Sequence, residues 1–161
     1  KETLKYILDY CAKKNKKVLW NFAPARAFDK KKKKKVSLLV VNETEAEILS
    51  GFPVNNSENT TSAIHKLMEL GIDTVILTLG EDGSLIGTHE GIEKVEAFTV
   101  KAVDTTAAGD VYCGSLAVAL VESKSLKEAV RFASAAAALS VTKLGAQPSA
   151  PYRKEIDEFL R

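Results

Sequence analysis

Apolar positions along the chain follow two spacings, and each change of spacing marks the end of a predicted element. Leu4, Ile7, Leu8 and Cys11 recur at helical spacing, which predicts an amphipathic helix over the first fifteen residues. Continuous apolar runs instead predict strands buried on both faces of a parallel sheet, and they lie at residues 18–22, 36–41 and 73–79. Short alternating segments from Ser84 to Val103 predict antiparallel strands around a turn at 89–91.

Helical patterns fill the segments between and after these strands. Asn59 is the predicted N-cap of one helix and Gly71 closes it, while Gly51 and Pro53 end an earlier one. The predicted helices cover residues 43–49, 59–70, 108–121, 126–143 and 152–160. Strands alternating with helices predict an α/β fold, a Rossmann-like three-layer α/β/α unit with a mostly parallel sheet and an appended antiparallel segment. A length of 161 residues fits a single domain, 1–161.

Charge and cysteine usage narrow the function classes. The chain has 23 basic and 21 acidic residues, and six of the lysines form one run, Lys30 to Lys35. Without that run 17 basic residues face 21 acidic ones, so the basicity is local, a solvated tract that argues against a nucleic-acid binder. The sequence contains no apolar run of about 18 residues, so it predicts no membrane span. Cys11 and Cys113 lack CxxC spacing, which indicates free thiols and a cytoplasmic location.

The stretch Asp104-Thr105-Thr106-Ala107-Ala108-Gly109-Asp110 carries the strongest chemical signal. Small residues at the start of an apolar helix leave its first backbone N–H groups open, which makes an anion site that the helix dipole strengthens. Asp110 in the first turn is placed to take a proton from an attacking hydroxyl while the amides hold a phosphoryl group. Helix capping by Asp104, Thr105 and Asp110 explains the same residues equally well.

This stretch resembles the signature of the PfkB-type carbohydrate kinases, the ribokinase family. Three further motifs, preceded by Asn21-Phe22-Ala23-Pro24-Ala25-Arg26, are similar to motifs of that family in the same order. They are Asn42-Glu43-Thr44-Glu45-Ala46-Glu47, the nucleotide loop Thr78-Leu79-Gly80-Glu81-Asp82-Gly83, and the C-terminal monovalent-cation motif Gly145-Ala146-Gln147-Pro148-Ser149. The resemblance covers nearly the whole chain and implies phosphorylation of D-ribose at its 5-hydroxyl by ATP, with Mg²⁺ and K⁺ as cofactors.

The resemblance also implies a role for each matching residue. Asp110 corresponds to the catalytic base, and Ala107, Ala108 and Gly109 correspond to the anion hole. Asn42 and Glu45 correspond to the pair that organises Mg²⁺. The residues implied to contact ATP are Asn42, Thr78, Gly80, Glu81, Asp82, Gly83, Gly109 and Ser134. The implied ligands of the monovalent cation are Asp104, Thr106, Ser140, Lys143, Gly145 and Ser149.

Structural interpretations compete with several of these roles. Asn42 and Glu45 also fit a capping box, and Gly80 with Gly83 also fits a plain strand-to-hairpin turn. Ser134 fits an ordinary helix face. His65 and His89 are each expected to be structural or exposed rather than ligands, and Trp20 and Met68 are expected to pack. The chain lacks the GxGxxG fingerprint, which disfavours an NAD-type oxidoreductase.

One departure from the family pattern bears on activity. The sugar-binding and lid motifs of the family precede the part that this chain resembles, so we expect the chain to correspond to the C-terminal, ATP-binding half. Without the sugar pocket of the missing N-terminal half, the isolated half is expected to be weak or inactive. The truncation would expose a sheet edge, a self-association hazard through which a homodimer could form, so the oligomeric state stays open. A nucleotide-binding module or a scaffold fragment, each without catalysis, are the alternatives.

Overall fold

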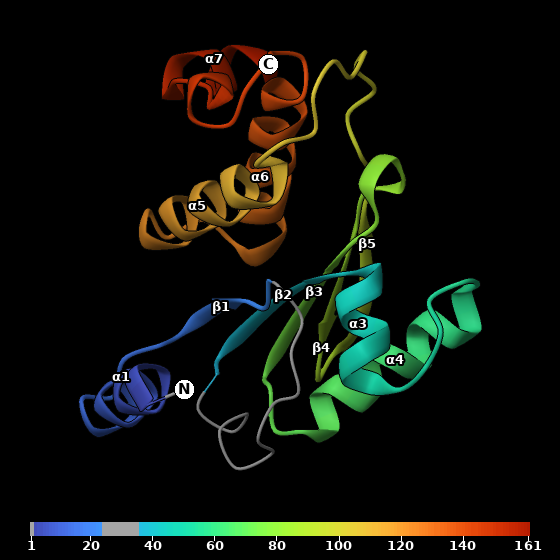
Figure 1. Ribbon diagram of the computed structural model, residues 1–161, viewed down its shortest axis with the longest axis vertical. Coiled ribbons are helices and arrows are strands. Elements are labelled where there is room, and N and C mark those ends of the chain that lie inside the picture. The colour runs from blue at the N-terminus through green and yellow to red at the C-terminus, as the bar shows by residue number, and fades with distance from the viewer. Residues whose placement is uncertain (1, 24–35) are drawn as a thin grey trace. The chain divides into compact units, whose positions relative to one another are not determined.

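The computed structural model describes residues 2–23 and 36–161, and its strands form one mixed sheet (Figure 1). The strands are β1 (Leu19–Asn21), β2 (Leu38–Asn42), β3 (Thr74–Thr78), β4 (Ser84–Thr88) and β5 (Gly91–Val95), and they lie side by side in that order. β1, β2 and β3 pair in parallel. β4 and β5 each neighbour the strand before them after a short connection, which only an antiparallel pairing allows. The predicted α/β class is confirmed.

Helices and short 3₁₀ turns connect and follow the strands. They are α1 (Glu2–Lys13), α3 (Glu43–Ser50), α4 (Ser57–Glu69), η1 (Gly80–Asp82), α5 (Ala108–Val121), α6 (Leu126–Ser140), η2 (Gln147–Ser149) and α7 (Arg153–Phe159). Contacts group the described residues into two compact units. One comprises residues up to Leu79 together with Leu85–Glu93, and the other comprises Gly80–Ser84 together with Lys94–Arg161. That the chain behaves as a single domain stays a prediction.

The first unit has an apolar core between the sheet and its helices. Leu39 and Val41 of β2 and Val75 and Leu77 of β3 alternate along their strands toward the same cluster of buried side chains. α1 adds Leu8, and α4 adds Ile64 and Leu67. All four apolar residues of β2 are buried, as expected for an interior parallel strand. Figure 1 shows α3 and α4 side by side, consistent with the contacts between them.

The second unit is built around the pair α5 and α6. Tyr112, Leu116 and Ala119 are the buried residues of α5. α6 opposes them with small side chains, Ala129, Ala133 and Ala136, each without exposed surface. Small residues allow two helices to approach closely, and α5 and α6 make the most extensive helix–helix contact in the described part of the chain. This packing fixes the direction of α5 and therefore of its N-terminus.

Two predicted boundaries were wrong. α4 begins at Ser57 with Asn56 as its N-cap, because Asn56 Oδ1 accepts a hydrogen bond from the Asn59 N–H at 2.9 Å. Asn59 is therefore inside the helix, and its side chain donates to Asn55 Oδ1 at 2.8 Å. α6 ends at Ser140 rather than 143, because the Ser140 and Thr142 hydroxyls donate to carbonyl groups three residues back and the chain turns there.

The alternation after β5 does not make a further strand. Residues 96–103 have no strand structure, although the apolar pattern predicted strands up to Val103. Phe98 packs at 5.1 Å on the ring of Phe159 and lies 5.1 Å beneath the Arg131 guanidinium. The Val103 N–H donates to the Val141 carbonyl at 2.7 Å. Apolar side chains in this segment thus contact helices instead of a neighbouring strand.

Two sequence expectations fall wholly or partly outside this description. The lysine run Lys30–Lys35 lies outside the described residues, as does the part of the first motif from Pro24 to Arg26. Within the part that is described, no helix has both the length and the apolar character needed to cross a bilayer.

Candidate functional site

The carboxyl ends of β2 and β3 bring two predicted site residues together. Asn42 is the last residue of β2 and Thr78 the last of β3, and they are paired partners in the parallel register. The Thr78 hydroxyl donates to the Val41 carbonyl at 3.4 Å, across the same strand pair. Ligands of open α/β sheets bind outside the carboxyl ends of the strands. Asn42 and Thr78 therefore lie at the edge where a ligand is expected.

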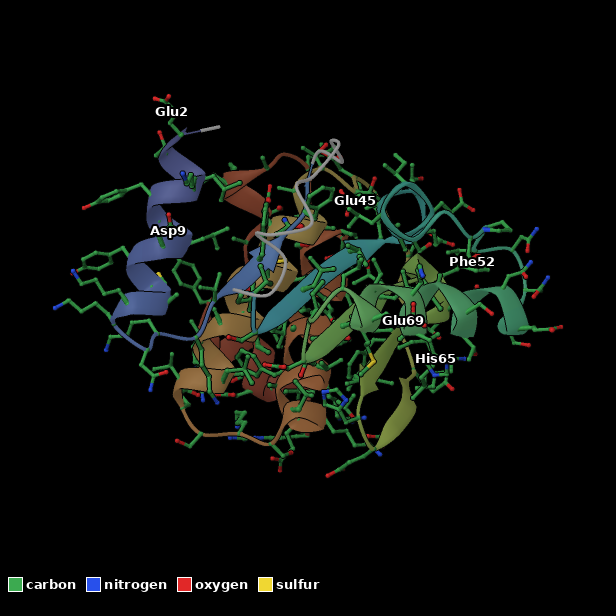
Figure 2. The ribbon with its side chains drawn as sticks, turned by 90° about the horizontal axis from the view of Figure 1, so that it is seen from below. Glu2, Asp9, Glu45, Phe52, His65 and Glu69 are labelled. Atoms are coloured by element: carbon green, nitrogen blue, oxygen red, sulfur yellow. The ribbon has the colours of Figure 1, made fainter. Side chains whose placement is uncertain are left out.

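Asn42 and Glu45 form a reciprocal capping box at the start of α3. Glu45 Oε2 accepts from the Asn42 N–H at 2.9 Å, and Asn42 Oδ1 accepts from the Glu45 N–H at 2.9 Å. The structural interpretation of these residues is confirmed. Figure 2 shows Glu45 where β2 runs into α3, and the residue is only 7% exposed. Its second oxygen, Oε1, has no partner in the described structure, so half of this buried carboxylate remains open.

The N-terminus of α5 has no such box. Ala107, its N-cap residue, has φ 62° and ψ 9°, a left-handed conformation that costs an alanine free energy, and no side chain caps the helix. The Ala108 N–H donates to the Thr105 carbonyl at 3.2 Å. The N–H groups of Gly109 and Asp110 have no partner in the described structure. Asp110 and Gly109 are both exposed, so two open amides and one carboxylate face solvent in the first turn.

The predicted nucleotide loop is a tight turn between β3 and β4. Gly80 and Gly83 have φ of 56° and 91°, and the Gly83 N–H donates to the Gly80 carbonyl at 3.3 Å. A Cβ on Gly83 would lie 2.2 Å from the Val95 carbonyl oxygen, so the backbone there permits no side chain. Glu81 and Asp82 are exposed. Gly83 thus has a structural reason to be glycine, whereas Gly80, Glu81 and Asp82 remain accessible.

Ser134 belongs to a buried hydroxyl cluster that sequence reasoning missed. The Tyr112 hydroxyl donates to Ser84 Oγ at 3.1 Å, and both residues are buried. Burial raises the pKa of Tyr112 to about 12, against the opposing influence of the Ser84 and Ser134 hydroxyls. Ser134 Oγ is buried without a hydrogen bond in the described structure. Tyr112 is one of the buried residues of α5, but nothing in the sequence pairs it with Ser84.

Residues 140–149, here called the cation loop, lie beside the Asp104 turn. Asp104 Oδ1 accepts from the Thr106 N–H at 2.9 Å, and Oδ2 accepts from the Gly145 N–H at 2.8 Å. The Thr106 and Gly145 bonds lower the pKa of Asp104. Ser140 and Ser149 are buried, and their hydroxyls donate to the carbonyls of Ala137 and Ala146. The structure thus brings Asp104, Thr106 and Gly145 into direct contact.

The oxygen ligands near Glu45 and those near Asp104 suit different metal ions. No group of three or more His, Cys, Asp or Glu residues gathers within the described ranges. One open carboxylate oxygen on Glu45 with the Asn42 amide beside it fits Mg²⁺, which keeps several waters and takes few protein ligands. The Asp104 carboxylate supplies oxygen atoms, the kind of ligand that suits a hard cation.

The remaining candidates are placed as follows. His65 and His89 are exposed, and Figure 2 shows His65 on the outer side of α4. Trp20 and Met68 pack against the apolar core of the first unit, as predicted. Cys11 and Cys113 are free cysteines. None of these residues changes the description of the site.

The fold and these motifs define a class of protein: an α/β protein with an open helix N-terminus for an anion and an acid in the first turn of that helix. Residues 1–153 match the pfkB family of carbohydrate kinases. The chain belongs to that family.

Individual relatives agree with this assignment. The chain is 45% identical over 150 residues to a ribokinase of Haemophilus influenzae, an alignment covering 92% of this chain and 49% of the relative. A ribokinase structure from Thermotoga maritima has a TM-score of 0.86 at 44% identity, covering 94% of this chain and 51% of its own. The Arabidopsis thaliana ribokinase complexed with ribose and ATP has a TM-score of 0.92 at 32% identity, covering 96% and 51%. The chain spans about half the length of these relatives.

Proposed function

We propose that this chain is the nucleotide-binding part of a ribokinase-type sugar kinase, which transfers the γ-phosphoryl group of ATP to the 5-hydroxyl of D-ribose. The Asp110 carboxylate takes the proton of that hydroxyl. The hydroxyl oxygen then bonds to the γ-phosphorus as the bond between this phosphorus and the bridging oxygen breaks, and ADP leaves. The open amides of α5 stabilise the charge on the phosphoryl oxygens. The site then returns to its starting state when Asp110 releases its proton.

The observation that carries this proposal is the uncapped N-terminus of α5. The other long helices with described N-caps, α3, α4 and α6, use Asn42, Asn56 and Ser125 to satisfy their first amides. α5 instead begins with a left-handed alanine and leaves the Gly109 and Asp110 amides free. Such an arrangement costs stability, and a phosphate group is the ligand that open helix amides bind best. The relative solved with ribose and ATP supports the same substrates.

The remaining site residues are assigned within this proposal. Asn42 and Glu45 organise Mg²⁺ through water, and the ion neutralises phosphate charge when it is bound. Glu81 and Asp82 contact ATP together with Thr78, Gly80, Gly83 and Ser134. The cation loop with Asp104 and Thr106 holds K⁺. The sugar pocket is supplied by polypeptide corresponding to the rest of the relatives, or by a second copy. We expect a cytoplasmic location.

A second candidate function is MgATP binding without catalysis. It is favoured by the open amides of α5, which can hold a phosphate group whether or not an acceptor lies beside it. Proximity of acceptor and donor supplies much of a kinase's rate, so a chain that binds ATP but holds no sugar would transfer little phosphate. This function requires the same open amides, and it differs only in the fate of the γ-phosphoryl group.

Titration with MgATP, monitored by calorimetry, tests both functions with a matched pair of glycine variants. A Cβ built on Gly109 or on Gly114 of the same helix meets no atom within 4 Å, so Gly109→Val and Gly114→Val should both fold. Only Gly109→Val blocks the open amides. We expect it to weaken ATP binding at least about tenfold, the loss of one charge-assisted hydrogen bond, while Gly114→Val binds as the parent does.

Phosphate transfer to D-ribose by the same chain then separates the two functions. Transfer that is lost in Asp110→Asn supports the kinase, whereas binding without transfer supports the nucleotide-binding function. A folded parent chain that does not bind MgATP would overturn both. Equal affinities of the Gly109 and Gly114 variants would remove the α5 amides from the site.

A further inference from the structure

One carboxylate of α7 contacts the cation loop. Glu155 Oε1 accepts a hydrogen bond from Lys143 Nζ at 2.9 Å, and the two side chains form a half-buried ion pair, each 40% exposed. The other oxygen, Oε2, accepts from the Tyr152 N–H at 2.6 Å. Glu155 therefore joins the first turn of its own helix to a residue of the loop twelve positions earlier.

The loop has few other connections of this kind. The Ser140, Thr142 and Ser149 hydroxyls all donate to carbonyl groups three residues away, so they shape the loop only locally. In the described structure, the side-chain bonds that tie the loop to other elements come from two carboxylates. Asp104 holds Gly145 from one side, and Glu155 holds Lys143 from the other.

Glu155 itself is held by a well-anchored helix. Ile156, its neighbour, is 4% exposed. Phe159 packs on Phe98 at 5.1 Å. Arg153 bonds to Glu122 at the end of α5 and to Asp157 on its own helix, and its guanidinium lies 5.1 Å over the Phe132 ring. These contacts keep α7 against α5 and α6, so Glu155 has a fixed position from which to hold the loop.

We propose that Glu155 is a positioning residue for the monovalent-cation site, acting through Lys143. Two physical effects follow from the pair. It fixes the course of the loop, and thereby the direction of its backbone carbonyls, which no loop side chain can do by a local bond. It also neutralises the Lys143 ammonium, which would otherwise repel a cation bound to the same segment. This inference rests on the proposed K⁺ site and not on the ATP site.

Thermal unfolding of the chain in KCl tests the proposal. The salt is exchanged against tetramethylammonium chloride at constant ionic strength, so that screening stays the same. A ligand that binds only the folded state raises Tm with its concentration. Glu155→Gln keeps an oxygen for the Tyr152 N–H but removes the charge that pairs with Lys143. We expect this variant to need about three- to fivefold more K⁺ for the same rise in Tm, as the loss of one half-exposed ion pair predicts.

Glu158→Gln is the matched control, because Glu158 lies on the same helix and pairs with Lys154 at 3.8 Å, away from the loop. It should respond to K⁺ as the parent does. Lys143→Met removes the pair from the other side and leaves the α7 cap intact. It should weaken the K⁺ response, and adding Glu155→Gln to it should change the response no further.

Each other outcome counts against the proposal. If Glu155→Gln lowers Tm but keeps the K⁺ dependence of the parent, Glu155 is only structural. Additive effects in the double variant would show that the two residues act separately. A parent chain whose Tm is the same in both salts would remove the cation site and this inference with it. The calorimetric titration with the Gly109 variant would still decide on the ATP site.

Discussion

The N-termini of α3 and α5 use the same backbone groups for opposite purposes. At α3, the Asn42 side chain accepts from the Glu45 N–H and the Glu45 side chain accepts from the Asn42 N–H, in a closed box of two 2.9 Å bonds. At α5 no side chain caps the helix, and Ala107 has a left-handed backbone. A closed N-terminus stabilises the fold, whereas an open one gives up that stabilisation and gains an anion site. The contrast separates residues that fold the chain from residues that serve a ligand.

Substitution of the acids in the first turns of the two helices should give the largest difference, measured as the loss of phosphate transfer. Asp110 stands at the open N-terminus and Glu43 at the closed one. In the kinase, we expect Asp110→Asn to lower phosphate transfer by about 10²- to 10⁴-fold, the usual contribution of a general base, because an amide cannot take the proton. Nucleotide affinity should stay the same.

Glu43→Gln is the matched control for this change. It removes one negative charge from the first turn of a capped helix, and transfer should be unaffected. Both variants are assayed for transfer to D-ribose and for ATP binding by calorimetry. Equal losses in the two variants would mean that a first-turn charge acts only through the field of the protein. The proposed role of Asp110 as a base would then be wrong.

Breaking the closed box should cost stability. Asn42→Ala removes the acceptor for the Glu45 N–H and should lower the free energy of unfolding by about 1 kcal/mol, the usual value for an N-cap. Asn42→Ser keeps a capping oxygen and should recover most of the loss. Urea unfolding followed by circular dichroism measures both. An Asn42→Ala variant as stable as its parent would show that the box does not stabilise α3.

The local signals that define both N-termini could be predicted from the sequence. The start of α5 at Ala108 follows from the change to small residues, and the box at Asn42 and Glu45 follows from their spacing. These features depend on residues at most four positions apart. Asn56 and Asn59 mark the limit, because both fit an N-cap and only the three-dimensional course of the chain before α4 selects Asn56.

Contacts distant in sequence could not be predicted in this way. The Tyr112–Ser84 hydrogen bond joins residues 28 positions apart, and Asp104 reaches Gly145 over 41. Each depends on how helices pack after the elements have formed. Residues 96–103 show the same limit, since an alternating apolar pattern is satisfied there by α6 and α7 rather than by a strand. The motifs located the candidate site, but the bonds that hold it came from the structure.

The strain at the open N-terminus should be measurable as a gain on substitution. Ala107 has φ 62°, which glycine adopts without steric cost. Ala107→Gly should raise the free energy of unfolding by about 0.5 kcal/mol, because the relief of roughly 1 kcal/mol of strain exceeds the added entropy of the unfolded chain. Ala117→Gly, at an exposed position in the middle of the same helix, should lower it by about 1 kcal/mol. Losses in both variants would show that Ala107 is unstrained.

The closed N-terminus of α6 offers the smallest effect, and it depends on pH. Glu128 Oε2 accepts from the Ser125 hydroxyl at 2.6 Å and from the Ser125 N–H at 2.9 Å, and these bonds lower the pKa of Glu128 below its ordinary value of 4.5.

A lowered folded-state pKa means that the unfolded chain binds the proton more readily. The stabilisation is therefore complete above the ordinary pKa and is lost as the pH falls through the lowered one. Glu128→Gln should have a lower Tm than the parent at pH 7, and the two should converge as the pH falls through the lowered pKa. Because Glu128 is exposed, the difference in Tm should be small. Added salt should reduce this difference only weakly, since hydrogen bonds rather than long-range charge account for most of it. A constant difference across this range would mean that the charge of Glu128 has no part in capping α6, and no difference at all would mean that an amide closes the N-terminus equally well.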